Sequence, residues 1–211
     1  MKANNGHAPS ARVLVLLAPA LLLVACGVLP KREPTAIFEP ARAAPVQHPD
    51  WPTANWSLLV AKPVGGGMLD NDRIVVRPAA GELTVYKATA WADPTPELVQ
   101  NALLRRFEDS GKILSVSRPG AGVRGEFQLQ TDVRAFESVY TAPNRPEVQV
   151  EIYARLVHTA DGEVVAARSF RETQTPSGEE IGSVVDAFSA ALGRATDQIA
   201  GWTLQAGNSH K

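Results

Sequence analysis

Two long stretches in the middle of the chain alternate between apolar and polar residues, and each alternation predicts a half-buried β-strand. The first covers residues 127–134 and the second covers residues 148–156. In both, apolar side chains would share one face of a sheet, while glutamine, arginine and acidic side chains share the other. Asp161-Gly162 follows as a type I′ hairpin signal that returns the chain into residues 163–172. The pattern predicts an antiparallel meander with one face in solvent.

Shorter apolar runs precede this meander. Residues 56–60 predict a first strand, and residues 72–77 and 83–86 predict two short strands joined by a Pro-Ala-Ala-Gly turn. A strand at residues 112–117 follows a helix, so a parallel strand–helix–strand crossover is expected. These runs add a parallel part to the sheet.

The helix before residue 112 has start and stop signals at both ends. Thr95 is the expected N-cap, Pro96 occupies a first-turn position, and Gly111 the left-handed C-cap. Its apolar side consists of Leu98, Val99, Ala102, Leu103 and Phe107. Its charged side, which we interpret as solvated, consists of Arg105, Arg106, Glu108 and Asp109.

A second helix is predicted near the C-terminus. Ser177-Gly-Glu-Glu180 matches a capping box at its start. Apolar residues then recur at spacings of four and three, which fits either a coiled-coil seam or a helix lying on its own sheet. We favour the helix on its own sheet, because packing on the domain stabilises most helices in globular proteins. These positions are Ile181, Val185, Phe188, Leu192, Ala195, Ile199 and Trp202.

The predicted fold class is therefore α/β: a single domain with a mixed β-sheet, an antiparallel meander and two main helices packed on it. We place this domain at residues 53–205 and expect residues 206–211 to be a loose polar tail.

The N-terminus has the layout of a secretory signal peptide. Lys2 and Arg12 precede an apolar run over residues 13–24, and Cys26, the single cysteine, follows small residues. Leu23-Val-Ala-Cys26 resembles the lipobox of bacterial lipoproteins, which makes residues 1–25 the signal and Cys26 the lipid-attachment site. Two alternatives are a transmembrane helix, which Pro19 and the short run disfavour, and an ordinary signal peptide that leaves a free thiol.

Residues 26–52 contain six prolines after the cysteine and little apolar periodicity. Proline-rich segments favour extended polyproline II, so we expect a lipidated tether of up to about 80 Å between membrane and domain.

Charge and motifs exclude several functions. Loss of Lys2 and Arg12 leaves nineteen basic against 22 acidic side chains, a net charge of −3 that gives no electrostatic footprint for nucleic acid. The glycines at 65–67 lack the lysine and hydroxyl of a phosphate-binding loop, and the four histidines (His7, His48, His158 and His210) show no metal-ligand spacing. The sequence predicts no cofactor, no metal site and no enzyme.

Several fragments in order resemble the ABC-type transport auxiliary lipoprotein family. They are residues 69–76, 86–91, 96–98, 107–111, 129–137 and 168–170. The resemblance covers about residues 55–203 and implies a mixed α/β sheet. It implies an outer-membrane lipoprotein that faces the periplasm, because Gly27 rather than Asp follows the cysteine. It also implies a partner, an MCE-domain protein of a system that moves phospholipids or other hydrophobic molecules, and it offers no catalytic residues.

Two other function classes stay open at this stage. One is a structural or regulatory lipoprotein that activates or scaffolds cell-wall enzymes from its tether, and the other is a hydrolase whose site is assembled from scattered residues. For the transport interpretation the expected docking surface has an apolar or aromatic centre, with Tyr153 and Trp91 as candidates, although core packing is the favoured role for Trp91. Self-assembly into a ring-shaped oligomer would fit such a role.

Overall fold

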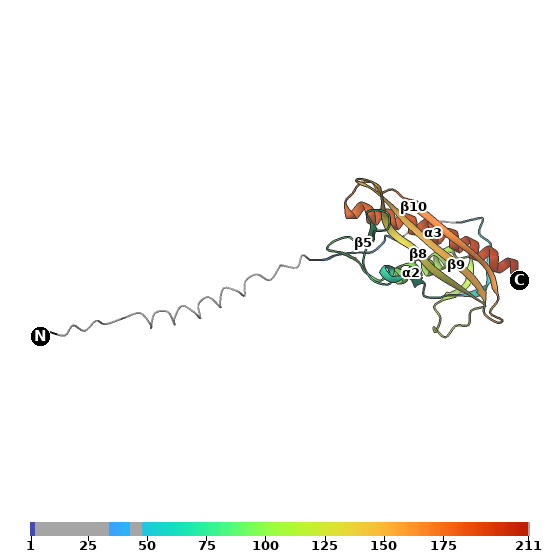
Figure 1. Ribbon diagram of the computed structural model, residues 1–211. Coiled ribbons are helices and arrows are strands. Elements are labelled where there is room, and N and C mark those ends of the chain that lie inside the picture. Colours follow the sequence, from blue (N-terminus) through green and yellow to red (C-terminus); the bar gives the residue numbers. More distant parts are fainter. Residues whose placement is uncertain (3–33, 43–47, 211) are drawn as a thin grey trace. The chain divides into compact units, whose positions relative to one another are not determined.

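The computed structural model describes residues 1–2, 34–42 and 48–210 (Figure 1). The chain divides into two compact units, Met1–Pro34 and Thr35–Lys211, and all the described helices and strands belong to the second. Residues 3–25 of the predicted signal peptide, Cys26, and residues 27–33 and 43–47 of the predicted tether lie outside the described residues.

The main sheet is mixed, as the sequence predicts. Its order is β10-β9-β8-β2-β7, with β8 antiparallel to β9 and β9 antiparallel to β10. Strand β2 is parallel to both β7 and β8, so the expected crossover through a helix is present. The strands are β2 (Ala54–Val60), β7 (Ile113–Ser117), β8 (Phe127–Ala142), β9 (Arg145–His158) and β10 (Val164–Gln174).

Short strands continue the sheet along β8 beyond its pairing with β2. Strands β3 (Val64–Gly65) and β4 (Val75–Arg77) pair with β8 in parallel, and β5 (Thr84–Val85) pairs with β4 in antiparallel. A one-turn 3-10 helix, η2 (Gly67–Leu69), occupies the glycine-rich loop. The two short strands predicted around the Pro-Ala-Ala-Gly turn are thus confirmed.

Two helices, α2 (Thr95–Ser110) and α3 (Ile181–His210), pack against the sheet and against each other. Figure 1 shows α3 running along β9 and β10. Trp91 lies at the centre of the core, 2% exposed, in edge contact with Phe136 of the sheet and Phe188 of α3. The apolar seam of α3 therefore faces its own sheet.

The helix starts differ from the sequence prediction. Thr95 is not the N-cap: Pro94 takes that position without a side-chain cap, and the Thr95 hydroxyl is buried without a partner. The capping box is also wrong, because α3 begins at Ile181 and the Ser177 hydroxyl donates to the Ser183 hydroxyl. In both cases the helix begins at least one residue away from the start that the sequence pattern predicts. The left-handed Gly111 C-cap is confirmed, with φ of 59°.

The β9–β10 hairpin is confirmed, but its turn is not type I′. That turn needs positive φ at both central residues, and of the pair only Gly162 has it, at 77°. The loop is wider, since the His158 amide donates to the Glu163 carbonyl and the Asp161 carboxylate accepts from the Glu163 amide.

The predicted loose tail is helical through His210. Gly207 is buried against Trp56, and the Asn208 side chain accepts from the Trp56 indole at 2.7 Å and donates to the Thr53 carbonyl at 3.0 Å. The polar composition of residues 206–211 predicted a loose tail, but the Asn208 side chain is hydrogen-bonded to residues at the start of β2.

The folded unit also begins earlier than residue 53. Strand β1 (Ala36–Phe38) pairs in parallel with β6 (Thr89–Trp91), and Pro40 is buried. Part of the segment predicted as a tether therefore packs on the domain.

Candidate docking surface

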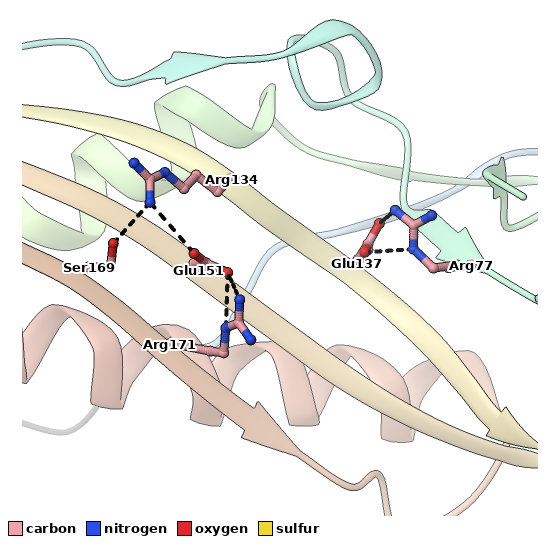
Figure 2. A network of polar contacts seen from close by, with 6 residues as sticks. All are labelled: Arg77, Arg134, Glu137, Glu151, Ser169 and Arg171. Atoms are coloured by element: carbon pink, nitrogen blue, oxygen red, sulfur yellow. Dashed lines mark hydrogen bonds and ion pairs between the residues drawn. The ribbon is translucent and has the colours of Figure 1, made fainter. Parts of the chain in front are cut away.

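The solvent face of the meander carries a network of ion pairs (Figure 2). Glu151 of β9 stands between Arg134 of β8 and Arg171 of β10. Arg171 donates to Glu151 Oε2 from Nε at 2.9 Å and also from Nη2, and Arg134 Nη1 lies 3.9 Å from Glu151 Oε1. Arg134 Nη1 also donates to the Ser169 hydroxyl at 3.0 Å. The network joins all three strands of the meander.

The position of Arg134 depends on an irregularity in the sheet. The β8–β9 register shifts between Val133 and Ala135, which face Ile152 and Glu151 respectively. Arg134 is the extra residue of this bulge, and bulges re-aim a side chain. The bulge thus lets Arg134 reach both Glu151 and the ring of Tyr153. Strict alternation in the sequence gave no sign of it.

Tyr153, the predicted docking residue, lies on this face. The Arg134 guanidinium carbon is 4.3 Å from the centre of its ring, a cation–π distance, and that of Arg155 is 5.9 Å away. Arg155 in turn lies 3.9 Å from Asp132. Trp91 does not lie on this face: its ring is buried in the core, which is the role that the sequence favoured for it.

A second ion pair extends the face toward β4. Arg77 donates from Nε and Nη2 to the two carboxylate oxygens of Glu137, each at 3.0 Å, a bidentate geometry. Figure 2 shows this pair further along β8 from Glu151. The hydrogen bond and charge of Glu137 raise the pKa of Arg77. The four arginines and three carboxylates named here nearly cancel in charge, so the geometry of this face, rather than its net charge, distinguishes it.

A cleft of about 330 Å³ lies on the helical side of the unit. Its floor comes from α2 and α3, and residues 39–42 form one wall. Arg106, predicted to be solvated, is only 5% exposed there, and its Nε lies 2.5 Å from Asp197 Oδ1. Burial raises the pKa of Asp197, although Arg106 and His48 oppose that shift. We regard this pair as part of the helix–helix packing.

The three described histidines, His48, His158 and His210, lie at two separate places in the fold. His48 stacks on Trp51 near α3, and the rings of His158 and His210 meet at the end of α3. Within residues 1–2, 34–42 and 48–210, no group of three or more His, Cys, Asp or Glu side chains is arranged to hold a metal ion. None of the described helices is long and apolar enough to cross a membrane.

Comparisons with known proteins agree with this architecture. The ABC-type transport auxiliary lipoprotein component family matches residues 38–200. Protein XCC0632 from Xanthomonas campestris is similar in structure, with a TM-score of 0.78 and 38% identity, over 83% of this chain and 98% of that one.

A second crystal structure, of an uncharacterized protein, shares the fold at a TM-score of 0.62 and 16% identity over 80% of this chain and 97% of its own. An uncharacterized protein of Bradyrhizobium diazoefficiens is 30% identical over 154 residues, which is 73% of this chain. The chain spans 41% of the length of that curated relative.

Proposed function

This chain belongs to the family of ABC-type transport auxiliary lipoprotein components, and from that membership we propose that it is a non-enzymatic accessory of a system that moves phospholipids or other hydrophobic molecules between two membranes. The observation that carries the proposal is the family match over residues 38–200 together with the lipobox that precedes it. Cys26 is the proposed lipid-attachment site, and the outer membrane, facing the periplasm, is the proposed location.

The proposed partner is an MCE-domain protein anchored in the opposite membrane. An accessory protein that catalyses no reaction can act only by binding another protein, so this chain requires a docking surface for its partner. We assign it to the face around Tyr153 and Arg134, because tyrosine and arginine are enriched at the centres of protein interfaces. The pre-formed network holds Arg134 over the Tyr153 ring, which lowers the entropy lost on docking.

Binding to the periplasmic part of the cognate MCE protein tests this proposal. A soluble form should begin at residue 35 rather than 53, because residues 36–40 pack on the domain. In analytical ultracentrifugation at tens of micromolar we expect a complex that persists at moderate salt, since the face is nearly charge-balanced. The same run reports whether copies of the chain associate with one another.

Tyr153→Ala should weaken the complex at least tenfold. Leu114→Ala is the matched control, because Leu114 is 70% exposed on β7 at the other edge of the sheet. Two species that sediment independently would refute the transport partner, and equal loss from both variants would refute the assigned face.

A further inference from the structure

The described residues that precede β2 hold to the domain at three places, and we call residues 35–42 and 48–52 the strap. The first place is β1, where the Ala36 amide donates to the Ala88 carbonyl at 2.9 Å and the Phe38 carbonyl accepts from the Ala92 amide at 2.8 Å. Strands β1 and β6 form a two-stranded sheet of their own, separate from the main sheet. The strap is therefore attached through β6 rather than through a strand of the main sheet, with Phe38 packed against the hydrophobic core.

The second place is the wall of the cleft between α2 and α3. The Ala41 amide donates to the Ser189 hydroxyl at 2.9 Å, and Glu39 lies 3.8 Å from Arg105. Pro40, which lies between Glu39 and Ala41 in the sequence, is buried. One backbone hydrogen bond, one exposed ion pair and the burial of Pro40 hold this part.

The third place is an aromatic clasp on α3. The rings of His48 and Trp51 stack at 3.8 Å with an interplanar angle of 5°, and His48 Nε2 lies 3.7 Å from Asp197 Oδ1. The Trp51 indole covers Gly201 so closely that a Cβ there would lie 2.7 Å from Trp51 Nε1. Glycine at this position of α3 is what lets the indole lie flat on the helix.

These contacts are specific but few. β1 has three residues, Ile37 is 70% exposed, and the carboxylate of Glu39 faces solvent. Isolated two-stranded pairings and exposed ion pairs contribute little stability, and segments of this kind open locally without global unfolding. The strap is thus able to detach while the main sheet and both helices stay folded.

We propose that the strap is a detachable segment that sets the reach between the membrane anchor and the folded unit. This inference rests on the proposed lipidation of Cys26. With the strap docked, nine residue steps separate Cys26 from Thr35, at most about 30 Å at ~3.3 Å per residue. With the strap released, twenty-seven steps separate Cys26 from Thr53, on the order of 90 Å. Docking therefore switches the protein between a short and a long tether.

Hydrogen exchange of the purified lipidated protein in detergent tests the docking. In the wild type, the amides of the non-proline residues in 36–42 and 48–52 should exchange more slowly than in a free peptide but faster than the buried turns of α3. Gly201→Leu should displace Trp51 and speed exchange at residues 48–52 at least tenfold. Gly182→Leu is the matched control, because no atom lies within 4 Å of a Cβ at that position of the same helix. Unchanged exchange in Gly201→Leu, or free-peptide rates in the wild type, would overturn the docked strap.

A reversible lock tests the change in reach. Ala41→Cys with Ser189→Cys replaces a 2.9 Å contact by a disulfide, and the native cysteine is consumed by lipid. In vesicles that contain a dansyl lipid, energy transfer from the four tryptophans should fall when the disulfide is reduced and recover on reoxidation. Equal transfer in the two states would overturn the reach switch. Failure to bind vesicles at all would refute lipidation instead, and the exchange experiment would still decide the docking.

Discussion

At the scale of single residues, Arg106 shows how burial separates neighbours that look alike in sequence. Arg105 and Arg106 were both assigned to a solvated helix face, but their side chains are 37% and 5% exposed. The hydrophobic period of α2 places Arg106 at the border of the packed side, and the partner that makes burial tolerable, Asp197, comes from α3 far along the chain. Sequence spacing in one helix carries no information about that partner.

Arg106→Ala should lower the free energy of unfolding by about 2–3 kcal/mol at neutral pH, because it leaves the Asp197 carboxylate half-buried without its cation. The pKa of Asp197 is already raised by burial, so loss of Arg106 should raise it further. A carboxyl whose folded-state pKa is raised favours the folded state as pH falls, and part of the lost stability should return at acid pH. Urea unfolding at pH 7 and pH 5 measures both effects. Arg105→Ala, the control, should change stability by less than about 0.5 kcal/mol.

The phenol of Tyr86 should make the stability of the fold depend on pH in the alkaline range. Burial, the largest cause, raises the pKa of its phenol from 10.0 to about 12, although its hydrogen bond to Ser138 at 3.1 Å opposes the shift. Below pH 10 the phenol is protonated in both states, and as pH rises toward 12 the unfolded state ionises first. Stability of about 1 kcal/mol, after discounting for its exposed part, should therefore be lost over this window.

Tyr86→Phe should remove this alkaline step from the pH dependence of unfolding. The variant also leaves the buried Ser138 hydroxyl without its partner, so a pH-independent loss of about 1 kcal/mol is expected. Absorbance of tyrosinate in the folded protein reports the same pKa directly. An identical loss of stability above pH 10 in both proteins would assign the step to another group.

At the scale of elements, the end of α3 supports the start of β2. Gly207→Ala would place a methyl group 2.4 Å from Trp56 Cζ2, so the indole or the helix must shift. Overpacking of this kind costs about 1–3 kcal/mol, which exceeds the gain of at most about 1 kcal/mol from helix propensity. Thermal unfolding should therefore occur at a lower temperature than in the wild type. Gly182→Ala, with open space around its Cβ, should be neutral or stabilising, and the same sign for both variants would contradict the close approach.

The sequence predicted most elements because their patterns are local. Alternation over residues 127–134 and 148–156 identified β8 and β9, and a left-handed glycine ended α2 at Ser110. The errors lie where a polar segment finds a distant partner. Asn208 bonds to Trp56 and Thr53, and Ala36 bonds to Ala88, contacts that no local pattern contains.

The candidate docking surface was partly predictable for the same reason. Alternation placed Tyr153 on the solvent face, since that follows from period two alone. The role of Arg134 was missed, because a bulge breaks the alternation at that residue and brings its guanidinium over the ring. A bulge depends on the pairing of β8 with β9, so a single strand's sequence does not reveal it.

At the scale of the whole molecule, lipidation of Cys26 is a proposal, and under it the strap would set the usable length of the chain between the anchor and the folded unit. If residues 31–50 were only a spacer, their length would matter and their sequence would not. The contacts of Ala36, Ala41 and His48 argue against it, because a scrambled sequence would lose β1 and the clasp. Scrambling should therefore alter reach even at constant length.

Cys26→Ala should abolish the anchor while leaving the folded unit intact. Each buried CH₂ of an acyl chain contributes about 0.8 kcal/mol, so two or three chains retain a protein on a membrane where one holds it only marginally. Growth with a radioactive fatty acid should label the wild type and leave the variant unlabelled, and the variant should fractionate away from the outer membrane. Gly182→Ala, the control, should label as the wild type does. Equal label in the wild type and in Cys26→Ala would refute the lipid anchor. It would also refute the proposed role of the strap in reach, because the strap can limit the distance to the membrane only if Cys26 is fixed in that membrane.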